Sequence, residues 1–188
     1  MGYFLFFILS NFTLTLLIVG LVFSVIGIVR TQQPLTTPVV VEKLFFWFIF
    51  FSLGIAYIYN GFSHTVMHEM AARLIGWADS PFQIELGFAS LGLGLVGVIA
   101  PWKSIHMRFA VIVPLSVFLW GAAGVHVYSM VTAGNFAPGN AGVIFWTDMV
   151  LPLIGLLFLG LQYRYEREGR SAAPYPNLGR MPAGPERM

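Results

Sequence analysis

The amino-acid sequence predicts an all-α integral membrane bundle of about five transmembrane helices. Of its 188 residues, 57% are apolar and only 10% are charged, whereas soluble domains carry about 25% charged residues. Several apolar segments approach the ~20 residues that a helix needs to cross the hydrocarbon layer of a bilayer. The chain has no cysteine, which excludes a disulfide framework, a thiolate metal site and a cysteine nucleophile.

The expected spans follow one another in the chain with short connections. They are residues 3–29, 44–62, 81–100, 109–132 and 143–163. The first apolar run is too long for a signal peptide and lacks a basic start, so we expect a membrane helix there. The last connection, TAGNFAPGN, is uncharged and rich in turn residues. Residues 1–163 therefore form the predicted transmembrane domain.

Two further segments are predicted to differ from the spans. Residues 63–78 have helical period, with Met67, Met70 and Leu74 on one face and histidines on the other. We expect a short amphipathic helix at the membrane interface. Residues 164–188 hold four prolines and mixed charges. Because such a segment buries little apolar surface, we expect a flexible cytoplasmic tail.

The basic residues predict the orientation in the membrane. With five spans, nine of the ten Lys and Arg residues fall on one side, and only Arg73 lies opposite. The positive-inside rule then places the N-terminus outside and the C-terminus inside. We expect a multi-pass protein of the cell inner (cytoplasmic) membrane, with the lipid bilayer as its surroundings. The basic residues form no dense patch, so a nucleic-acid partner is not expected.

Histidine and acidic residues gather on the predicted outer side. His64 and His68 are four residues apart, a spacing that lets two imidazoles on one helix bind one metal ion. Glu85 lies about one turn inside the third span. Since small residues flank it on two sides of that helix, we expect Glu85 to point into the bundle. His126 and Asp148 reach similar depth from the fourth and fifth spans.

This outer polar cluster favours the binding of a metal cation or of protons. Imidazole and carboxylate ligands suit Zn, Cu or Fe, and an acid inside a membrane is a candidate functional group by default. The structural alternative is that the histidines line a wet helix face and the carboxylates fix helix register through hydrogen bonds. The residues leave both interpretations open. No nucleophile stands beside a base in a suitable arrangement, so an enzyme is not expected.

Local patterns predict two structural roles near the cluster. Ser80 is suited to cap a helix, Pro81 to its first position, and Gln83 to complete a capping box. Glu69 and Arg73 are four residues apart in the order that favours a surface ion pair.

A second class of function is open on composition. Eighteen Phe and five Trp residues suit wide contacts with lipid and with other membrane proteins. The chain would then be a non-catalytic structural or accessory subunit of a larger membrane complex, or part of a homo-oligomer.

The stretch IGWADSPFQIELGFASLGLGLVGV, residues 75–98, resembles a pattern in a family of small, uncharacterised prokaryotic membrane proteins. The pattern comprises IGW at 75–77, SPFQ at 80–83, Glu85, Gly87 and LGLG at 91–94. A fainter resemblance connects the chain with the DoxX-like membrane proteins, which also place Glu and Gly in a span but usually have four spans. Both resemblances imply a helical membrane bundle, and neither implies a known activity.

Overall fold

The structure is a computed structural model that describes residues 2–172, with side chains to residue 168. All regular elements in this part of the chain are helices, as predicted. They are α1 (Gly2–Ser10), α2 (Phe12–Val29), α3 (Thr37–Trp47), the π-helix η1 (Phe48–Ile55), α4 (Ala56–Thr65), α5 (His68–Ile75), α6 (Pro81–Ile99), the 3₁₀-helix η2 (Ala100–Trp102), α7 (Ile105–Ala133), α8 (Pro138–Ala141) and α9 (Val143–Ala172).

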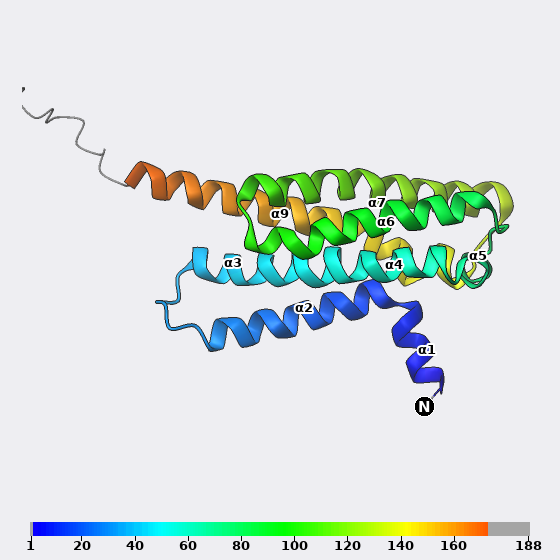
Figure 1. The fold of residues 1–188 in the computed structure, drawn as a ribbon, viewed down its shortest axis with the longest axis horizontal. Helices are drawn as coiled ribbons and strands as arrows, with labels where there is room; N and C mark the ends of the chain where they lie inside the picture. Colours follow the sequence, from blue (N-terminus) through cyan, green and yellow to red (C-terminus); the bar gives the residue numbers. More distant parts are fainter. Residues whose placement is uncertain (1, 173–188) are drawn as a thin grey trace, which may run out of the picture.

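Five helical rods are long and apolar enough to cross a membrane, which confirms the predicted bundle. They are Phe12–Val29, Thr37–Thr65, Pro81–Trp102, Ile105–Ala133 and Pro138–Glu168. Figure 1 shows them side by side, with the short α5 at one end of the bundle and the start of α3 at the other. We call these the α5 end and the α3 end. The orientation of the two ends in a membrane stays a prediction.

The first span begins later than the sequence predicted. The helix breaks at Asn11, whose backbone leaves the α region (φ −113°, ψ 37°) and whose side-chain amide donates to the Phe7 carbonyl at 2.8 Å. Asparagine favours such local hydrogen bonds over continued helix. The residues before it form α1, which bends away from α2 (Figure 1). Its large apolar side chains are exposed, from Tyr3 to Phe7.

The last helix continues beyond the predicted end of the fifth span. Residues 164–172 are helical, so the expectation of a flexible tail is wrong for them. Arg164 donates to Glu168 at 2.8 Å, one turn later on the same face, and such pairs support an exposed helix. The remainder of the predicted tail, 173–188, lies outside the described residues.

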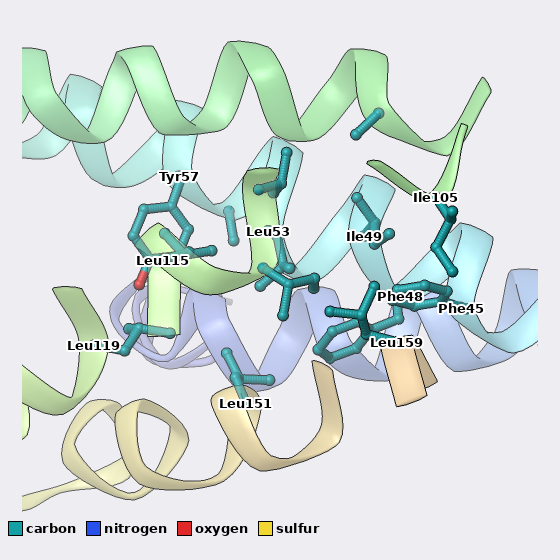
Figure 2. Packing of buried hydrophobic residues seen from close by; sticks show 14 of the residues in the cluster. Phe45, Phe48, Ile49, Leu53, Tyr57, Ile105, Leu115, Leu119, Leu151 and Leu159 are labelled. Carbon is teal, nitrogen blue, oxygen red and sulfur yellow. The ribbon is translucent and has the colours of Figure 1, made fainter. Parts of the chain in front are cut away.

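Large apolar side chains fill the centre of the bundle. Figure 2 shows Phe45, Phe48 and Ile49 from the α3–η1 rod in one apolar cluster with Leu115 of α7 and Leu151 of α9. These side chains are almost fully buried. Close packing of this kind, together with hydrogen bonds, holds helices together in lipid, where burial from water supplies little driving force.

Glycines bring α4 and η1 against α6 at backbone distance. A Cβ built on Gly94 would lie 2.5 Å from the Ile58 backbone nitrogen, and one on Gly97 would lie 2.9 Å from the Gly54 Cα. Gly87 and Ser90 share this buried face of α6. The predicted small-residue contact is therefore present on one side of the third span.

The second span contains a π-helical segment. In η1, each backbone hydrogen bond closes over one more residue than in an α-helix. The segment packs against both α2 and α6, and five of its eight residues, among them Ser52 and Leu53, are buried. The π segment is thus held by neighbours on more than one side.

A buried arginine joins several elements at the α3 end. Arg108 of α7 is 4% exposed and donates to both carboxylate oxygens of Glu42 in α3, at 2.6 and 2.7 Å. It also donates to the Pro101 carbonyl at 2.6 Å and to the Gln162 amide oxygen at 3.0 Å. In the sequence, Arg108 is one of the nine Lys and Arg residues expected on the inner side of the membrane.

Candidate functional site

A large cavity opens at the α5 end, between α1, α2, α4, α5, α7 and α9. Its volume is about 820 Å³, within the range of about 300–1,000 Å³ that is usual for small-molecule sites. Apolar side chains form most of the wall. The polar side chains that line it include Ser10, Thr13, Tyr57, Tyr59, Asn60, Ser63, His64, Arg73, Trp77, His126 and Asp148.

His126 and Asp148 form a buried pair on the cavity wall. The Nε2 atom of His126, on α7, lies 3.8 Å from an Oδ2 oxygen of Asp148, on α9. Each residue is only 5% exposed. Sequence reasoning expected these two residues at the same depth, and the structure brings them together.

Asn140 fixes the tautomer of His126. The Asn140 amide nitrogen donates to the His126 carbonyl at 3.2 Å and to the Asn135 carbonyl at 2.8 Å. Its amide oxygen therefore faces His126 Nδ1, at 2.8 Å, and accepts the hydrogen on that nitrogen. In the neutral ring Nε2 then carries a lone pair, and it is the nitrogen nearer Asp148.

An aromatic contact fixes the plane of the same imidazole. The Trp77 indole stacks on His126, with ring centroids 5.3 Å apart and planes at 26°. The indole N–H donates to Ser129 Oγ at 3.2 Å, and Asn135 also donates to that oxygen at 3.1 Å. His126 is thus oriented by contacts on its face and at Nδ1.

His64 lies on the cavity wall with a different partner. Its Nδ1 atom is 2.8 Å from Gln83 Oε1, and both side chains are buried. Gln83 had been predicted to complete a capping box. That prediction is wrong because Ser80 caps α6 without a side-chain hydrogen bond and the Gln83 side chain bonds to His64 instead. The predicted helix start at Pro81 is confirmed.

The prediction that His64 and His68 lie on one helix is wrong. The helix breaks at Val66 and Met67, so His64 lies in the last turn of α4 while His68 begins α5. Thr65 Oγ donates to the Gly61 carbonyl at 2.7 Å, a bond that bends helices. His68 lies 2.9 Å from Asp79 at the partly exposed surface.

Glu85 does not point into the bundle. It lies on the exposed face of α6, together with Ala89 and Gly92. A Cβ on Gly92 would meet nothing within 4 Å, so small residues on this side of the helix do not mark a packed contact. Glu69 and Arg73 form the predicted exposed ion pair, at 3.5 Å.

The structure does not bring together all five residues proposed for metal binding: His64 and His68 have separate partners, His126 pairs with Asp148, and Glu85 lies on the exposed face of α6. Among residues 2–172, no group of three or more His, Asp or Glu side chains is arranged to hold a metal ion. Protein zinc sites use three or four protein ligands. His126 and Asp148 are the two predicted site residues that the structure brings together, and His64 shares their cavity.

Residues 10–168 match a family of unknown function, DUF6790. The chain belongs to this family. This confirms the resemblance to an uncharacterised family that the pattern at residues 75–98 indicated. No curated protein and no solved structure matches the chain in the other two comparisons. The chemistry of the site therefore has to support any functional assignment for this DUF6790 member.

Sequence reasoning missed three residues that shape the site. Gln83 was assigned to a cap, Asn140 to a turn-rich loop and Trp77 to the membrane interface. Their roles depend on partners that are distant in sequence, at His64 and His126. One signal was present in the sequence: two asparagines, Asn135 and Asn140, in an uncharged loop next to a span.

Proposed function

We propose that this protein binds a small lipophilic molecule with a hydroxyl group, and that the His126–Asp148 pair exchanges a proton with that hydroxyl. The observation that carries the proposal is the buried pair, which lies in the wall of a mainly apolar cavity. Cavities of this composition take apolar molecules and orient them through a few polar groups.

The charge balance of the pair supports proton exchange. An isolated buried carboxylate is costly, so Asp148 is stabilised either by a protonated imidazole or by a proton of its own. In both cases the His126–Asp148 pair holds one proton in addition to the one on His126 Nδ1. This proton can reside on either partner, which is the property that a proton relay requires.

The distance within the pair supports a hydroxyl ligand. At 3.8 Å, His126 Nε2 and Asp148 Oδ2 are too far apart for a direct hydrogen bond. A hydroxyl group can donate to one partner and accept from the other. An alcohol or phenol at this place would bridge the pair, whereas its methyl ether could only accept.

Of the two cations that the sequence favours, a metal ion or a proton, the proton suits this site better. A transition metal would need further ligands, and the neighbouring candidates His64 and His68 already have Gln83 and Asp79 as partners. Glu85 lies on another face of α6. We therefore propose a proton rather than a metal ion as the cation at this site.

Binding of 4-octylphenol and of its methyl ether, 4-octylanisole, to the purified protein in detergent tests the proposal. We expect the phenol to bind about tenfold more tightly, because one hydrogen bond to a polar buried group is worth about 1.5 kcal/mol. Asp148→Asn and His126→Gln should each remove most of this preference. Isothermal titration calorimetry measures both affinities.

Asp79→Asn is the matched control, since Asp79 is a partly exposed carboxylate that does not line the cavity. This variant should keep the preference for the phenol. Equal affinity for phenol and ether in the unmodified protein would overturn the proposal. A co-purified protein subunit that occupies the cavity would favour the accessory-subunit function instead.

A further inference from the structure

His64 and His126 are held in the same way at two places in the wall of the main cavity. The Nδ1 atom of His126 lies 2.8 Å from the Asn140 amide oxygen, and that of His64 lies 2.8 Å from the Gln83 amide oxygen. An amide oxygen only accepts hydrogen bonds, so Nδ1 carries the hydrogen in both rings. In each neutral imidazole, Nε2 is then an acceptor. The function proposed above uses Nε2 of His126 and gives that of His64 no role.

The free nitrogen of His64 opens into the cavity. His64 lines the cavity and Gln83 does not, so the Nδ1 edge of the ring is turned away from the cavity and the Nε2 edge toward it. Among residues 2–168, Nε2 has no hydrogen-bond partner, and it is not one of the fully enclosed polar atoms. Buried polar groups are nearly always satisfied. An acceptor that faces a cavity therefore indicates a ligand with a donor.

Asn60 adds a second acceptor one turn earlier on α4. It also lines the cavity, and its amide nitrogen donates to Ser90 Oγ of α6 at 3.0 Å. Its amide oxygen has no partner in the described part of the chain. Residues four apart lie on one face of a helix, so the Asn60 oxygen and His64 Nε2 lie on the same side of α4. Two acceptors at this place again suit a ligand that brings a hydrogen-bond donor.

The donor on the ligand is a hydroxyl rather than an ammonium. Asp148 is the sole carboxylate among the described residues that line the cavity, and it is paired with His126. An ammonium at His64 would lie in a mainly apolar cavity without a counter-ion, which is costly. A hydroxyl is neutral and donates one hydrogen bond.

The two hydroxyl positions are separate. Within residues 2–172, His64 does not join His126 and Asp148 in a group able to hold one metal ion, so their polar atoms do not converge on one point. Most of the remaining wall is apolar, with Phe118, Leu119 and Ile144 among its side chains. A ligand that reaches both positions therefore has an apolar part between two polar ends.

We propose that the cavity binds a lipophilic diol, in which an apolar part separates two hydroxyl groups. One hydroxyl exchanges its proton with the His126–Asp148 pair, and the second donates to His64 Nε2. This inference rests on the proposed function, because it adds a second contact to the same ligand. His64 then determines specificity, since it favours a diol over a molecule with one hydroxyl.

Binding of 4-(ω-hydroxyalkyl)phenols and of their ω-methyl ethers, with chains of two to eight carbons, tests the proposal. The phenol end occupies the His126–Asp148 pair, and the series of chain lengths finds the one that reaches His64. At that length, we expect the alcohol to bind about tenfold more tightly than its methyl ether, since one hydrogen bond to a buried acceptor provides this ratio. Isothermal titration calorimetry measures it in detergent. Equal binding of alcohol and ether at every chain length would overturn the proposal.

Two variants at His64 should reduce this ratio to near one. His64→Phe removes the acceptor and keeps a ring. The double variant His64→Phe/Gln83→Met replaces both hydrogen-bond partners by apolar groups of similar size, a change that costs little stability. His106→Phe is the matched control, because His106 is exposed at the α3 end, and it should leave the ratio unchanged. A ratio that persists in both His64 variants would also overturn the proposal.

The preference for 4-octylphenol over 4-octylanisole separates this proposal from the proposed function. His64→Phe should keep that preference, which also shows that the variant is folded. Asp148→Asn should lose it and should still favour the ω-alcohol over its ether. A phenol preference without an alcohol preference in the unmodified protein would overturn the diol alone. The absence of both would overturn the proposed function as well.

Discussion

His126 and Asp148 face each other across 3.8 Å from two different transmembrane helices. A substitution of either residue should affect the other, because both side chains are buried in the wall of the same cavity. This relationship leads to a prediction about stability that does not require the ligand to be known.

A double-mutant cycle of Asp148→Asn and His126→Gln should show coupling. Because the two residues share one proton, we expect an interaction free energy of about 0.5–3 kcal/mol. Equilibrium unfolding in detergent measures it. The control pairs His126→Gln with Glu168→Gln, a change about 30 Å further along α9 than Asp148. Additivity within about 0.5 kcal/mol is expected for that pair, and additivity for the first pair would contradict proton sharing.

Arg108 should contribute strongly to stability at the α3 end. Arg108→Met removes the cationic partner of the Glu42 carboxylate, which keeps a hydrogen bond from the Gln162 amide nitrogen, and leaves the Gln162 and Pro101 oxygens without the donor from Arg108. We expect a loss of about 3 kcal/mol in the free energy of unfolding, the lower end for breaking a buried ion pair, because Glu42 is partly exposed.

Arg164→Met is the matched control for this experiment. Its ion pair with Glu168 is exposed, and exposed pairs contribute about 0–1 kcal/mol. Similar losses for the two arginine variants, measured by the same unfolding assay, would show that the buried network is not what stabilises this end.

Two glycines of α6 should respond oppositely to alanine. Gly94→Ala places a Cβ 2.5 Å from the Ile58 backbone nitrogen, so the helices must separate, at a cost of about 1–3 kcal/mol. Gly92→Ala meets nothing within 4 Å and should gain up to about 1 kcal/mol from higher helix propensity. Thermal unfolding of both variants measures the difference, and equal shifts would refute the close contact between α4 and α6.

Labelling of single cysteines tests the predicted orientation. The chain has no cysteine, so Glu69→Cys and Lys103→Cys each introduce a unique and exposed thiol. In right-side-out membrane vesicles, a membrane-impermeant maleimide should label position 69 and should label position 103 only after permeabilisation. The reverse pattern would show that the positive-inside rule fails for this chain.

Features that depend on local sequence could be predicted. The number of spans follows from the lengths of the apolar runs, and the helix start at Pro81 follows from the serine and proline there. The ion pair of Glu69 and Arg73 follows from their spacing. Each of these depends on residues that are contiguous or only a few positions apart in the sequence.

Features that depend on packing partners could not be predicted. Gly92 and Gly94 look alike in the sequence, yet one faces open space and the other a helix backbone. For the same reason, the face on which Glu85 lies could not be inferred from its small neighbours. The spacing of His64 and His68 was misinterpreted because the break between α4 and α5 changes the direction of the chain.

The π-helical segment η1 sets the rotational phase of the second span. Since a π turn accommodates about one residue more than an α turn, the residues after Ile55 are turned by about 100° relative to an uninterrupted α-helix. In that uninterrupted helix, Gly61 would no longer meet α6 and His64 would no longer meet Gln83. The alignment of the cavity wall with the α3 half of the span thus depends on a single additional residue, so a one-residue deletion near Phe51 would disturb the site from several turns away.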